Sequence, residues 1–369
     1  MKSELRGIMK RQYDNYRVFK AYSVQTLLKE ALLFPRDILT PGGRSSNVLN
    51  LALFVTLRCN ARCAMCNLSD ILNKNSLTDM PPDKMGRFLD DVKRYHPGII
   101  LFGGEPFIRK DIVELIRMVK SRGLSVGTFT NGTLLNEDII DGIIGAGLDW
   151  IAFSLQGTRD VHDRILGSAG AFEKMVGNIS VLTKKRPRKT RVVIHSTICE
   201  HNVNDLRDLA VLGLDLGADL VRFGHPTFYS QREALSCTDA LRKGLGDDHV
   251  KALSYIYDIR GKEDLYVSNI TKIRSEFGNR ISFSPDLGAD ELRRWYSPDF
   301  SSGRKCLFAW RGAFVYPNGD MYPCESIAYN VGNVFDNNFD DVWNGDRYKK
   351  MRQLLKKRLF SACARCCKL

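Results

Sequence analysis

Short apolar runs alternate with amphipathic segments between about residues 50 and 225, and this alternation limits most strongly how the chain can fold. The segment 109–121, for example, carries Ile112, Ile116 and Val119 at helical spacing. Strands that alternate with helices in this order pair in parallel through right-handed crossovers. We therefore predict a parallel sheet that binds its ligands at the carboxyl ends of the strands. The six expected strands are 51–57, 99–102, 125–130, 150–155, 191–198 and 220–223.

A cysteine triplet follows the first expected strand: Cys59, Cys63 and Cys66 have C-x3-C-x2-C spacing. Thiolates are the soft ligands that iron–sulfur clusters need, and three of them leave one iron of a four-iron cubane without a protein ligand. A structural zinc site and buried apolar cysteines are the alternatives, although zinc usually takes four protein ligands. The spacing predicts a metal centre at this strand end and leaves cluster and zinc open.

A second motif, Gly103-Gly104-Glu105, follows the second expected strand. Glycines at a strand end let the backbone approach a ligand closely, and a carboxylate there can pair with an ammonium group. Together with the cysteine triplet, this motif resembles the radical S-adenosylmethionine (radical SAM) superfamily. The resemblance implies that the triplet holds a [4Fe-4S] cluster whose open iron binds S-adenosylmethionine (SAM). It also implies that Gly103, Gly104 and Glu105 contact the methionine ammonium of SAM.

The resemblance also implies the architecture, because periodicity alone does not separate an open sheet from a barrel. We expect an α/β fold, a partial (β/α)6 TIM-like barrel with a small cysteine-rich C-terminal domain. The barrel is expected over 49–230, preceded by a helical lead-in over 1–48 and followed by a helical linker over 231–303. A partly apolar face over 18–33 is expected to pack on the barrel, with peripheral membrane contact as the alternative.

Residues 153–172 resemble the S-x-D-G, H-D-x-x-R-G and G-x-F string of radical SAM enzymes that carry a SPASM or twitch extension. Two positions depart from that pattern. Gln156 replaces the usual aspartate, and Leu166 stands where an arginine commonly reaches the cofactor carboxylate. We expect Arg164 to take that role and Ser154 to contact the ribose or carboxylate, although the Ser154 hydroxyl could instead satisfy its own turn.

Several other polar residues have both a functional and a structural interpretation. Thr130-Asn131-Gly132 ends the third expected strand, and Asn-Gly is foremost a turn signal. His195 either points into the barrel toward the adenosine or has a structural partner. The remaining candidates, each a substrate contact or an ordinary loop residue, are Arg222, His225, Tyr229 and Glu325.

The C-terminal region carries a second set of cysteines: Cys306, Cys324, Cys363, Cys366 and Cys367. The segment 315–324 predicts two short strands around an Asn-Gly turn. Residues 304–369 resemble a SPASM domain, but they have too few cysteines for the two clusters of a full one. The resemblance implies one auxiliary [4Fe-4S] cluster, hence two clusters in all. Its expected ligands are Cys306, Cys324, Cys363 and Cys366, with Cys367 as a substitute or a spare and zinc as the alternative metal.

Composition supports an ordinary globular protein, with 44% hydrophobic and 26% charged residues. The sequence has no apolar run long enough to span a bilayer, so we expect a cytosolic location, where ten cysteines are better explained as metal ligands than as disulfides. The net charge of +13 is spread along the chain, and no nucleic acid is expected as a partner.

The resemblance implies that the protein cleaves SAM reductively to a 5′-deoxyadenosyl radical, with electrons from a donor such as flavodoxin or ferredoxin. The radical would abstract a hydrogen atom from a small molecule or natural product and start its oxidation or rearrangement. Maturation of a ribosomally made peptide is the alternative substrate class. A non-catalytic electron-transfer or zinc-stabilised binding protein is the alternative of a different kind.

Overall fold

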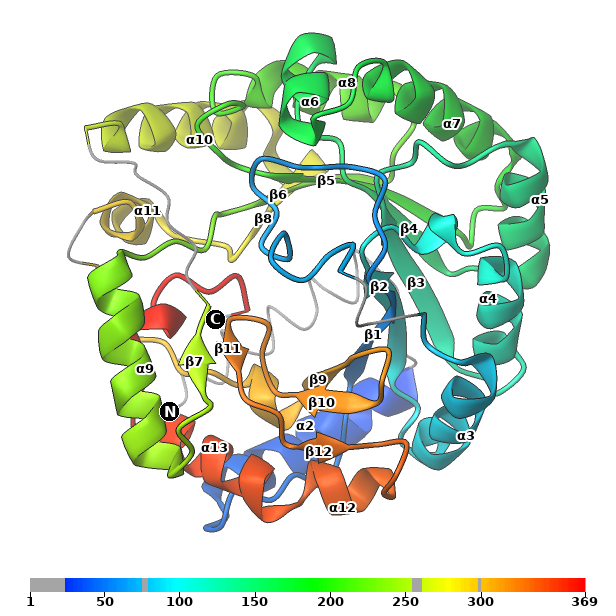
Figure 1. The fold of residues 1–369 in the computed structure, drawn as a ribbon. Coiled ribbons are helices and arrows are strands. Elements are labelled where there is room, and N and C mark those ends of the chain that lie inside the picture. Colours follow the sequence, from blue (N-terminus) through cyan, green and yellow to red (C-terminus); the bar gives the residue numbers. More distant parts are fainter. Residues whose placement is uncertain (1–23, 75–78, 254–260, 298–299, 369) are drawn as a thin grey trace.

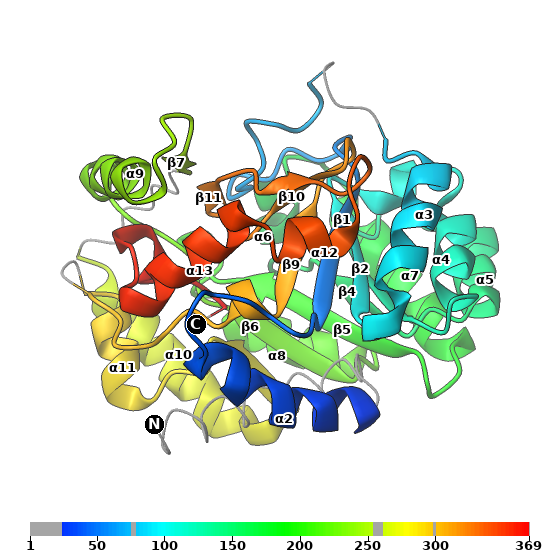
Figure 2. The same ribbon diagram turned by 90° about the horizontal axis from the view of Figure 1, so that it is seen from below.

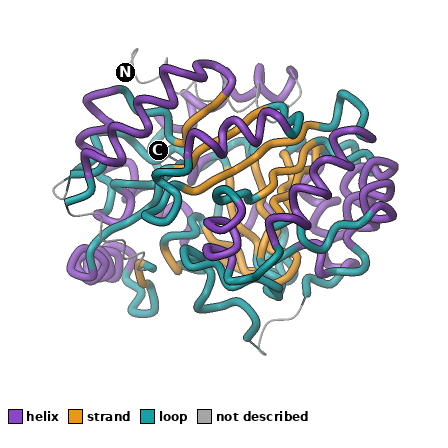
Figure 3. The backbone as a smooth tube through the Cα atoms, turned by 90° about the horizontal axis from the view of Figure 1, so that it is seen from above, coloured by secondary structure: helices purple, strands orange, loops and turns teal. Residues whose placement is uncertain are grey.

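The computed structural model describes residues 24–74, 79–253, 261–297 and 300–368. Its main sheet has ten strands in the order β12-β10-β9-β1-β2-β3-β4-β5-β6-β8, curved around a central axis with helices outside (Figures 1 and 3). The six central strands pair in parallel in chain order, which confirms the predicted barrel. They are β1 (Asn50–Thr56), β2 (Gly98–Gly103), β3 (Ser125–Thr130), β4 (Trp150–Phe153), β5 (Arg191–Thr197) and β6 (Leu220–Gly224).

Helices cover the outer face of the sheet because the outward strand residues are apolar. Leu51, Leu53 and Val55 of β1 are fully buried in one hydrophobic cluster with Leu115 and Ile116 of α4. The helices of the barrel are α3 (Pro82–Val92), α4 (Ile112–Lys120), α5 (Glu137–Ala146), α6 (Arg159–Leu166), α7 (Ala171–Lys185) and α8 (Leu206–Asp215).

The inner face of the sheet is less buried than the outer face. In β2, β3, β5 and β6 the inward residues Ile100, Phe102, Phe129, His195 and Arg222 are half-buried, whereas their outward neighbours are buried. Alternation along a strand places these residues on one face. Other inward residues, such as Trp150 and Val193, are buried, so the half-buried positions mark the part of the inner face on which ligands can lie.

The stretch 231–303, expected to be a helical linker, also contributes strands. Its helices are α9 (Gln231–Leu245), α10 (Glu263–Phe277) and α11 (Ala289–Trp295). Between α10 and α11, β8 (Ile281–Ser284) pairs in parallel with β6 and lengthens the barrel sheet. The short strand β7 (Lys251–Ala252) pairs with β11 (Ile327–Ala328). The four-residue Ile-Ser-Phe-Ser run of β8 was too short to stand out in the sequence.

The C-terminal region is joined to the barrel through its sheet. The predicted hairpin around Asn318-Gly319 forms β9 (Gly312–Val315) and β10 (Asp320–Tyr322), and β9 pairs in parallel with β1. The other C-terminal elements are β12 (Gly332–Asn333), α12 (Phe339–Trp343) and α13 (Asp346–Lys357). Figure 2 shows this region packed along one side of the barrel.

The described part of the expected lead-in is α2 (Val24–Leu39), while residues 1–23 lie outside the described residues. Arg311, which directly precedes β9, stacks on Phe34 at 3.4 Å from the ring centroid and forms an ion pair with Glu30. These contacts fix α2 against the start of the C-terminal hairpin. Among the described residues, no helix is long and apolar enough to cross a membrane.

Candidate active site

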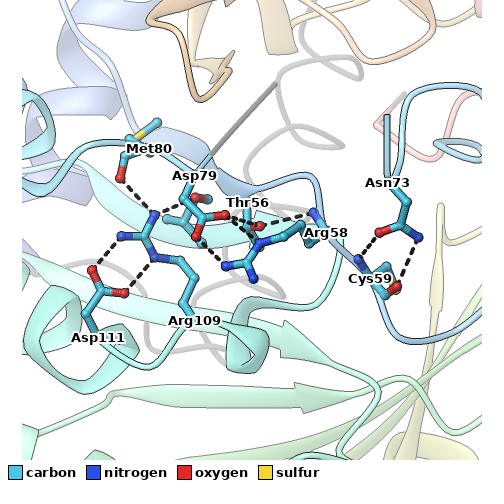
Figure 4. Close-up of polar contacts among 9 residues, drawn as sticks. Thr56, Arg58, Cys59, Asn73, Asp79, Met80, Arg109 and Asp111 are labelled. Carbon is cyan, nitrogen blue, oxygen red and sulfur yellow. Dashed lines mark hydrogen bonds and ion pairs between the residues drawn. The ribbon is translucent and has the colours of Figure 1, made fainter. Parts of the chain in front are cut away.

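The cysteine triplet lies on the loop that follows β1, and all three side chains are half-buried. Polar contacts fix the start of this loop (Figure 4). The backbone N–H of Cys59 donates to Asn73 Oδ1 at 2.9 Å, and Asn73 Nδ2 donates back to the Cys59 carbonyl at 3.0 Å. Thr56 Oγ1 and the Arg58 guanidinium both donate to the carboxylate of Asp79. The loop is thus held in place by its own side chains.

The middle of the loop docks on the end of α6. The N–H of Arg62 donates to the carbonyl of Leu166 at 3.0 Å, and the N–H of Ala64 donates to that of Ile165 at 2.8 Å. The Leu166 side chain is buried in a cluster that Cys59 and Cys63 contact. This packing accounts for an apolar residue at the position where the resembled pattern has an arginine.

The three thiols are close enough to affect one another electrostatically. Burial, then the neighbouring Cys66 and Cys59, raises the pKa of Cys63 to about 12. Thiolates gathered this way need positive charge, which iron supplies. Within the described ranges, no three His, Cys, Asp or Glu side chains converge to bind a single metal ion. Three thiolates match three irons of a cubane, whereas structural zinc usually takes four protein ligands.

Gly103 and Gly104 bring the end of β2 against the cysteine loop. The N–H groups of Gly104 and Glu105 each donate at 2.9 Å, to the carbonyls of Thr56 and Arg58. A Cβ atom on Gly103 or Gly104 would lie 2.1 Å from one of those two carbonyl oxygens, and Gly103 has φ +128°. Only glycine permits this approach. The two motifs recognised in the sequence therefore form one structural unit.

The Glu105 carboxylate is buried and accepts three hydrogen bonds. Oε1 accepts from the Thr130 hydroxyl at 2.8 Å and from the Phe107 N–H at 3.1 Å. Oε2 accepts from the Asn131 N–H at 2.7 Å. Burial outweighs these donors and raises the pKa of Glu105 to about 7. An ammonium group nearby would favour the ionised form. The Thr130-Asn131 strand end, for which the sequence favoured a turn over a functional role, thus supports Glu105.

We predict that Glu105→Ala keeps its iron but binds SAM more weakly and is less stable. The variant leaves the Thr130 hydroxyl and two buried N–H groups without their acceptor, which costs about 1–3 kcal/mol for each group that finds no other partner. Iron analysis, SAM calorimetry and urea unfolding measure the three effects. The control Glu114→Ala removes an exposed carboxylate on α4. Wild-type SAM affinity in Glu105→Ala would refute this role.

The other residues singled out in the 153–172 segment differ in how deeply their side chains are buried. Ser154 is half-buried just past β4, and its hydroxyl has no hydrogen bond to another described residue. Gln156 is buried, and its side-chain Oε1 accepts from the backbone N–H of Thr197 in β5 at 3.0 Å. The backbone N–H of Gln156 donates to Nδ1 of His162 in α6 at 3.1 Å. Arg164 is exposed in the last turn of α6. The surroundings of Ser154 suit a ligand contact better than those of Arg164.

The C-terminal cysteines gather around Cys324 and the end of the chain. Burial, then Cys324 and Cys306, raises the pKa of Cys363 well above its usual value. Cys366 forms a hydrogen bond with Cys367, which raises the pKa of Cys366 and lowers that of Cys367 to about 7. All five thiols of this region therefore lie within electrostatic reach of a neighbour. One [4Fe-4S] cluster takes four cysteine ligands and this region has five cysteines, so either Cys366 or Cys367 would be the fourth ligand.

Aromatic side chains on the inner wall connect the two cysteine regions. Phe54 of β1 stacks on Tyr316 with ring centroids 4.4 Å apart, and Tyr316 contacts Tyr322 at 4.8 Å. Cys66 packs against the same cluster. At the other end, the Ser284 hydroxyl of β8 donates to the Cys367 carbonyl at 3.2 Å. Both cysteine regions thus border the same inner wall, a proximity that required the β1–β9 pairing.

Comparison with known proteins agrees with this arrangement. Residues 53–212 match the radical SAM superfamily, and residues 306–367 match the SPASM iron–sulfur cluster-binding domain. An AdoMet-dependent heme synthase of Methanosarcina barkeri is 26% identical over 305 residues, spanning 82% of this chain and 84% of the relative. A PqqA peptide cyclase of Rhodopseudomonas palustris is 25% identical, spanning 77% of this chain and 69% of the relative.

The fold is also that of solved structures. Streptococcus suis SuiB bound to S-adenosylmethionine aligns with a TM-score of 0.61 over 93% of this chain and 78% of that structure, at 16% identity. The two matched domains together cover more than half of the chain and contain both cysteine sets. The chain therefore belongs to the radical SAM superfamily and carries a SPASM domain, and it is an enzyme that depends on a [4Fe-4S] cluster and SAM.

Proposed function

We propose that this enzyme uses SAM-derived radical chemistry to oxidise or rearrange a small-molecule substrate held against the inner wall of the barrel. The observation that carries the proposal is that the cysteine loop after β1 and the C-terminal cysteines border the same accessible wall. When bound, the cluster and SAM supply a 5′-deoxyadenosyl radical, which removes a hydrogen atom from the substrate.

The residues of the chain would share the work of binding and positioning. Cys59, Cys63 and Cys66 would hold the cluster, and the Gly103–Glu105 turn would orient the amino group of SAM beside it. Ser154 would contact the ribose or carboxylate of SAM. The buried apolar surroundings of the loop would keep water from the reacting atoms.

The C-terminal cysteines would hold one auxiliary [4Fe-4S] cluster. The ligands we propose are Cys306, Cys324, Cys363 and Cys366. A cluster beside the substrate wall could accept the electron that an oxidised substrate releases. The reducing electrons for SAM cleavage would come from an external donor such as flavodoxin or ferredoxin, and the expected location is the cytoplasm.

The proposal favours a small molecule because AdoMet-dependent heme synthases from three organisms each match more than 80% of this chain. Peptide maturation is the second candidate, favoured by the PqqA peptide cyclase relatives and by the fold shared with SuiB, which has been solved with its precursor peptide. An aromatic wall can bind a peptide side chain as well as a small molecule.

We predict that the small-molecule fraction of a cell extract, digested with protease, stimulates 5′-deoxyadenosine formation by the reduced holoenzyme. Growing the cells in deuterated medium should then place deuterium in the 5′-deoxyadenosine, because the radical takes its hydrogen from the substrate. Mass spectrometry measures both effects, with a reaction lacking reductant as the control. Stimulation that disappears on protease digestion would instead establish a peptide substrate.

A further inference from the structure

The inner wall of the barrel is divided into an aromatic part and a polar part. On the aromatic part, Phe129 of β3 contacts Phe102 of β2 at 5.8 Å and Trp150 of β4 at 5.5 Å between ring centroids. The next inward residue around the wall is His195 of β5, whose ring meets Phe129 edge to face at 5.5 Å. At the level of His195, the wall is polar from β5 onward.

The polar part is a row of three side chains in register across three neighbouring strands. His195 of β5 pairs with Arg222 of β6, and Arg222 pairs with Ser282 of β8. All three are half-buried, whereas Ile194, Val221 and other outward neighbours are buried against helices. A guanidinium between an imidazole and a hydroxyl, at one level of a barrel, brings together donors that suit an anion.

Two members of the row have unused hydrogen-bonding groups. In the described part of the chain, no hydrogen bond reaches either ring nitrogen of His195, and the Ser282 hydroxyl is buried without a partner. Burial, then the charge of Arg222, lowers the pKa of His195 to about 3, so its ring is neutral and has one N–H to donate. Arg222 already makes a polar contact within the chain, but its five N–H donors allow more than one acceptor.

A lysine–glutamate pair lies close to Cys367, where the charge of Arg222 also acts. The carboxylate of Glu325 binds Lys368 at 2.8 Å, and the Lys368 ammonium also lies over the ring of Phe314 at 4.9 Å. The positive charge of Arg222 acts on the Cys367 thiol as well as on His195, so the row faces the C-terminal cysteines.

We propose that the row of His195, Arg222 and Ser282 binds a carboxylate of the substrate, while an apolar part of the substrate packs on the aromatic wall. This inference rests on the proposed function, because it places the substrate in the barrel. It narrows the substrate class to carboxylic acids that carry a flat or apolar portion. Arg222 would supply the bidentate contact, and the neutral His195 would add a donor without adding charge.

A pair of probes tests the proposal without knowledge of the substrate. Radiolabelled 3-phenylpropionate carries an aromatic ring and a carboxylate, and 3-phenylpropionamide is its uncharged analogue. Anaerobic equilibrium dialysis against the SAM-loaded holoenzyme should show the acid bound about tenfold more tightly than the amide, since hydrogen bonds to a charged group contribute on that order. Equal binding of the two probes would overturn the proposal.

Variants locate the preference within the barrel. Arg222→Met should abolish it, and Arg222→Lys and His195→Phe should each reduce it several-fold. Arg191→Met is the matched control. Arg191 lies on the same face of β5 as His195 but at the start of the strand, where it forms an ion pair with Asp219 at 3.5 Å. That control should keep the preference.

A preference that survives in Arg222→Met would refute the assignment. If Arg222→Met does not fold, as judged by its iron content and circular dichroism, an unchanged preference in both Arg222→Lys and His195→Phe refutes it equally. Formation of 5′-deoxyadenosine by the wild-type protein is measured in parallel. If the wild-type protein forms no 5′-deoxyadenosine, the proposed function is contradicted. If it forms 5′-deoxyadenosine but binds the acid no better than the amide, only this subsite is contradicted.

Discussion

Replacing Cys59, Cys63 and Cys66 together with alanine is expected to abolish formation of 5′-deoxyadenosine and to lower the iron content from about eight to about four per chain, as two four-iron cubanes require. The physical reason is that these side chains are the soft ligands of the loop after β1, and no other described cysteine side chain except the buried Cys199 packs against that loop. Colorimetric iron analysis and chromatography of the reaction products measure the two effects.

The matched control is Cys237→Ala, which removes a buried cysteine of α9 outside the cysteine loop. It should keep both its iron and its ability to cleave SAM. SAM cleavage that persists in the triple variant would contradict the assignment of these cysteines. Loss of all iron in that variant would instead show that the C-terminal cysteines hold no cluster of their own.

The second large effect is expected when Cys306, Cys324, Cys363 and Cys366 are replaced together. About four irons should be lost, and residues 304–368 should exchange amide hydrogens faster, because a cluster joins the hairpin to the distant chain end. The backbone of β9 should stay more protected than the rest of this region, because it is paired with β1 in the barrel sheet. Hydrogen exchange measured by mass spectrometry distinguishes β9 from the rest of residues 304–368.

Cys199→Ala serves as the control for this variant, since Cys199 is buried near α6 and far in sequence from the C-terminal set. Zinc found in place of iron after anaerobic purification would contradict the predicted auxiliary cluster. Twelve irons in the intact protein would show that the region holds two clusters instead of one.

The central barrel could be predicted from sequence because each strand is a run of apolar residues between helical patterns. Strand β3 was predicted at its observed bounds, and the other five differ by at most two residues at either end. Strand β8 was missed because two serines interrupt its four residues. The pairing of β9 with β1 joins residues far apart in the sequence, and local patterns carry no signal for such a contact.

The candidate site was partly predictable for a similar reason. Cysteine spacing and adjacent glycines are local signals, and both motifs lie where they were expected, at the carboxyl ends of β1 and β2. The support of Glu105 by Thr130 and Asn131 depends on the neighbouring strand, so it became visible only in three dimensions. The cysteine loop docks on the backbone of Leu166, and this contact explains why a leucine stands where the resembled pattern has an arginine. The sequence showed the difference but not its reason.

The central claim is that this protein cleaves SAM through the cluster of the β1 loop. The most direct test is to incubate the anaerobically reconstituted, reduced wild-type protein with SAM and to quantify 5′-deoxyadenosine and methionine. The account predicts both products in equal amounts, only when the protein is reduced. Absence of 5′-deoxyadenosine from reduced protein with a full complement of iron would contradict it.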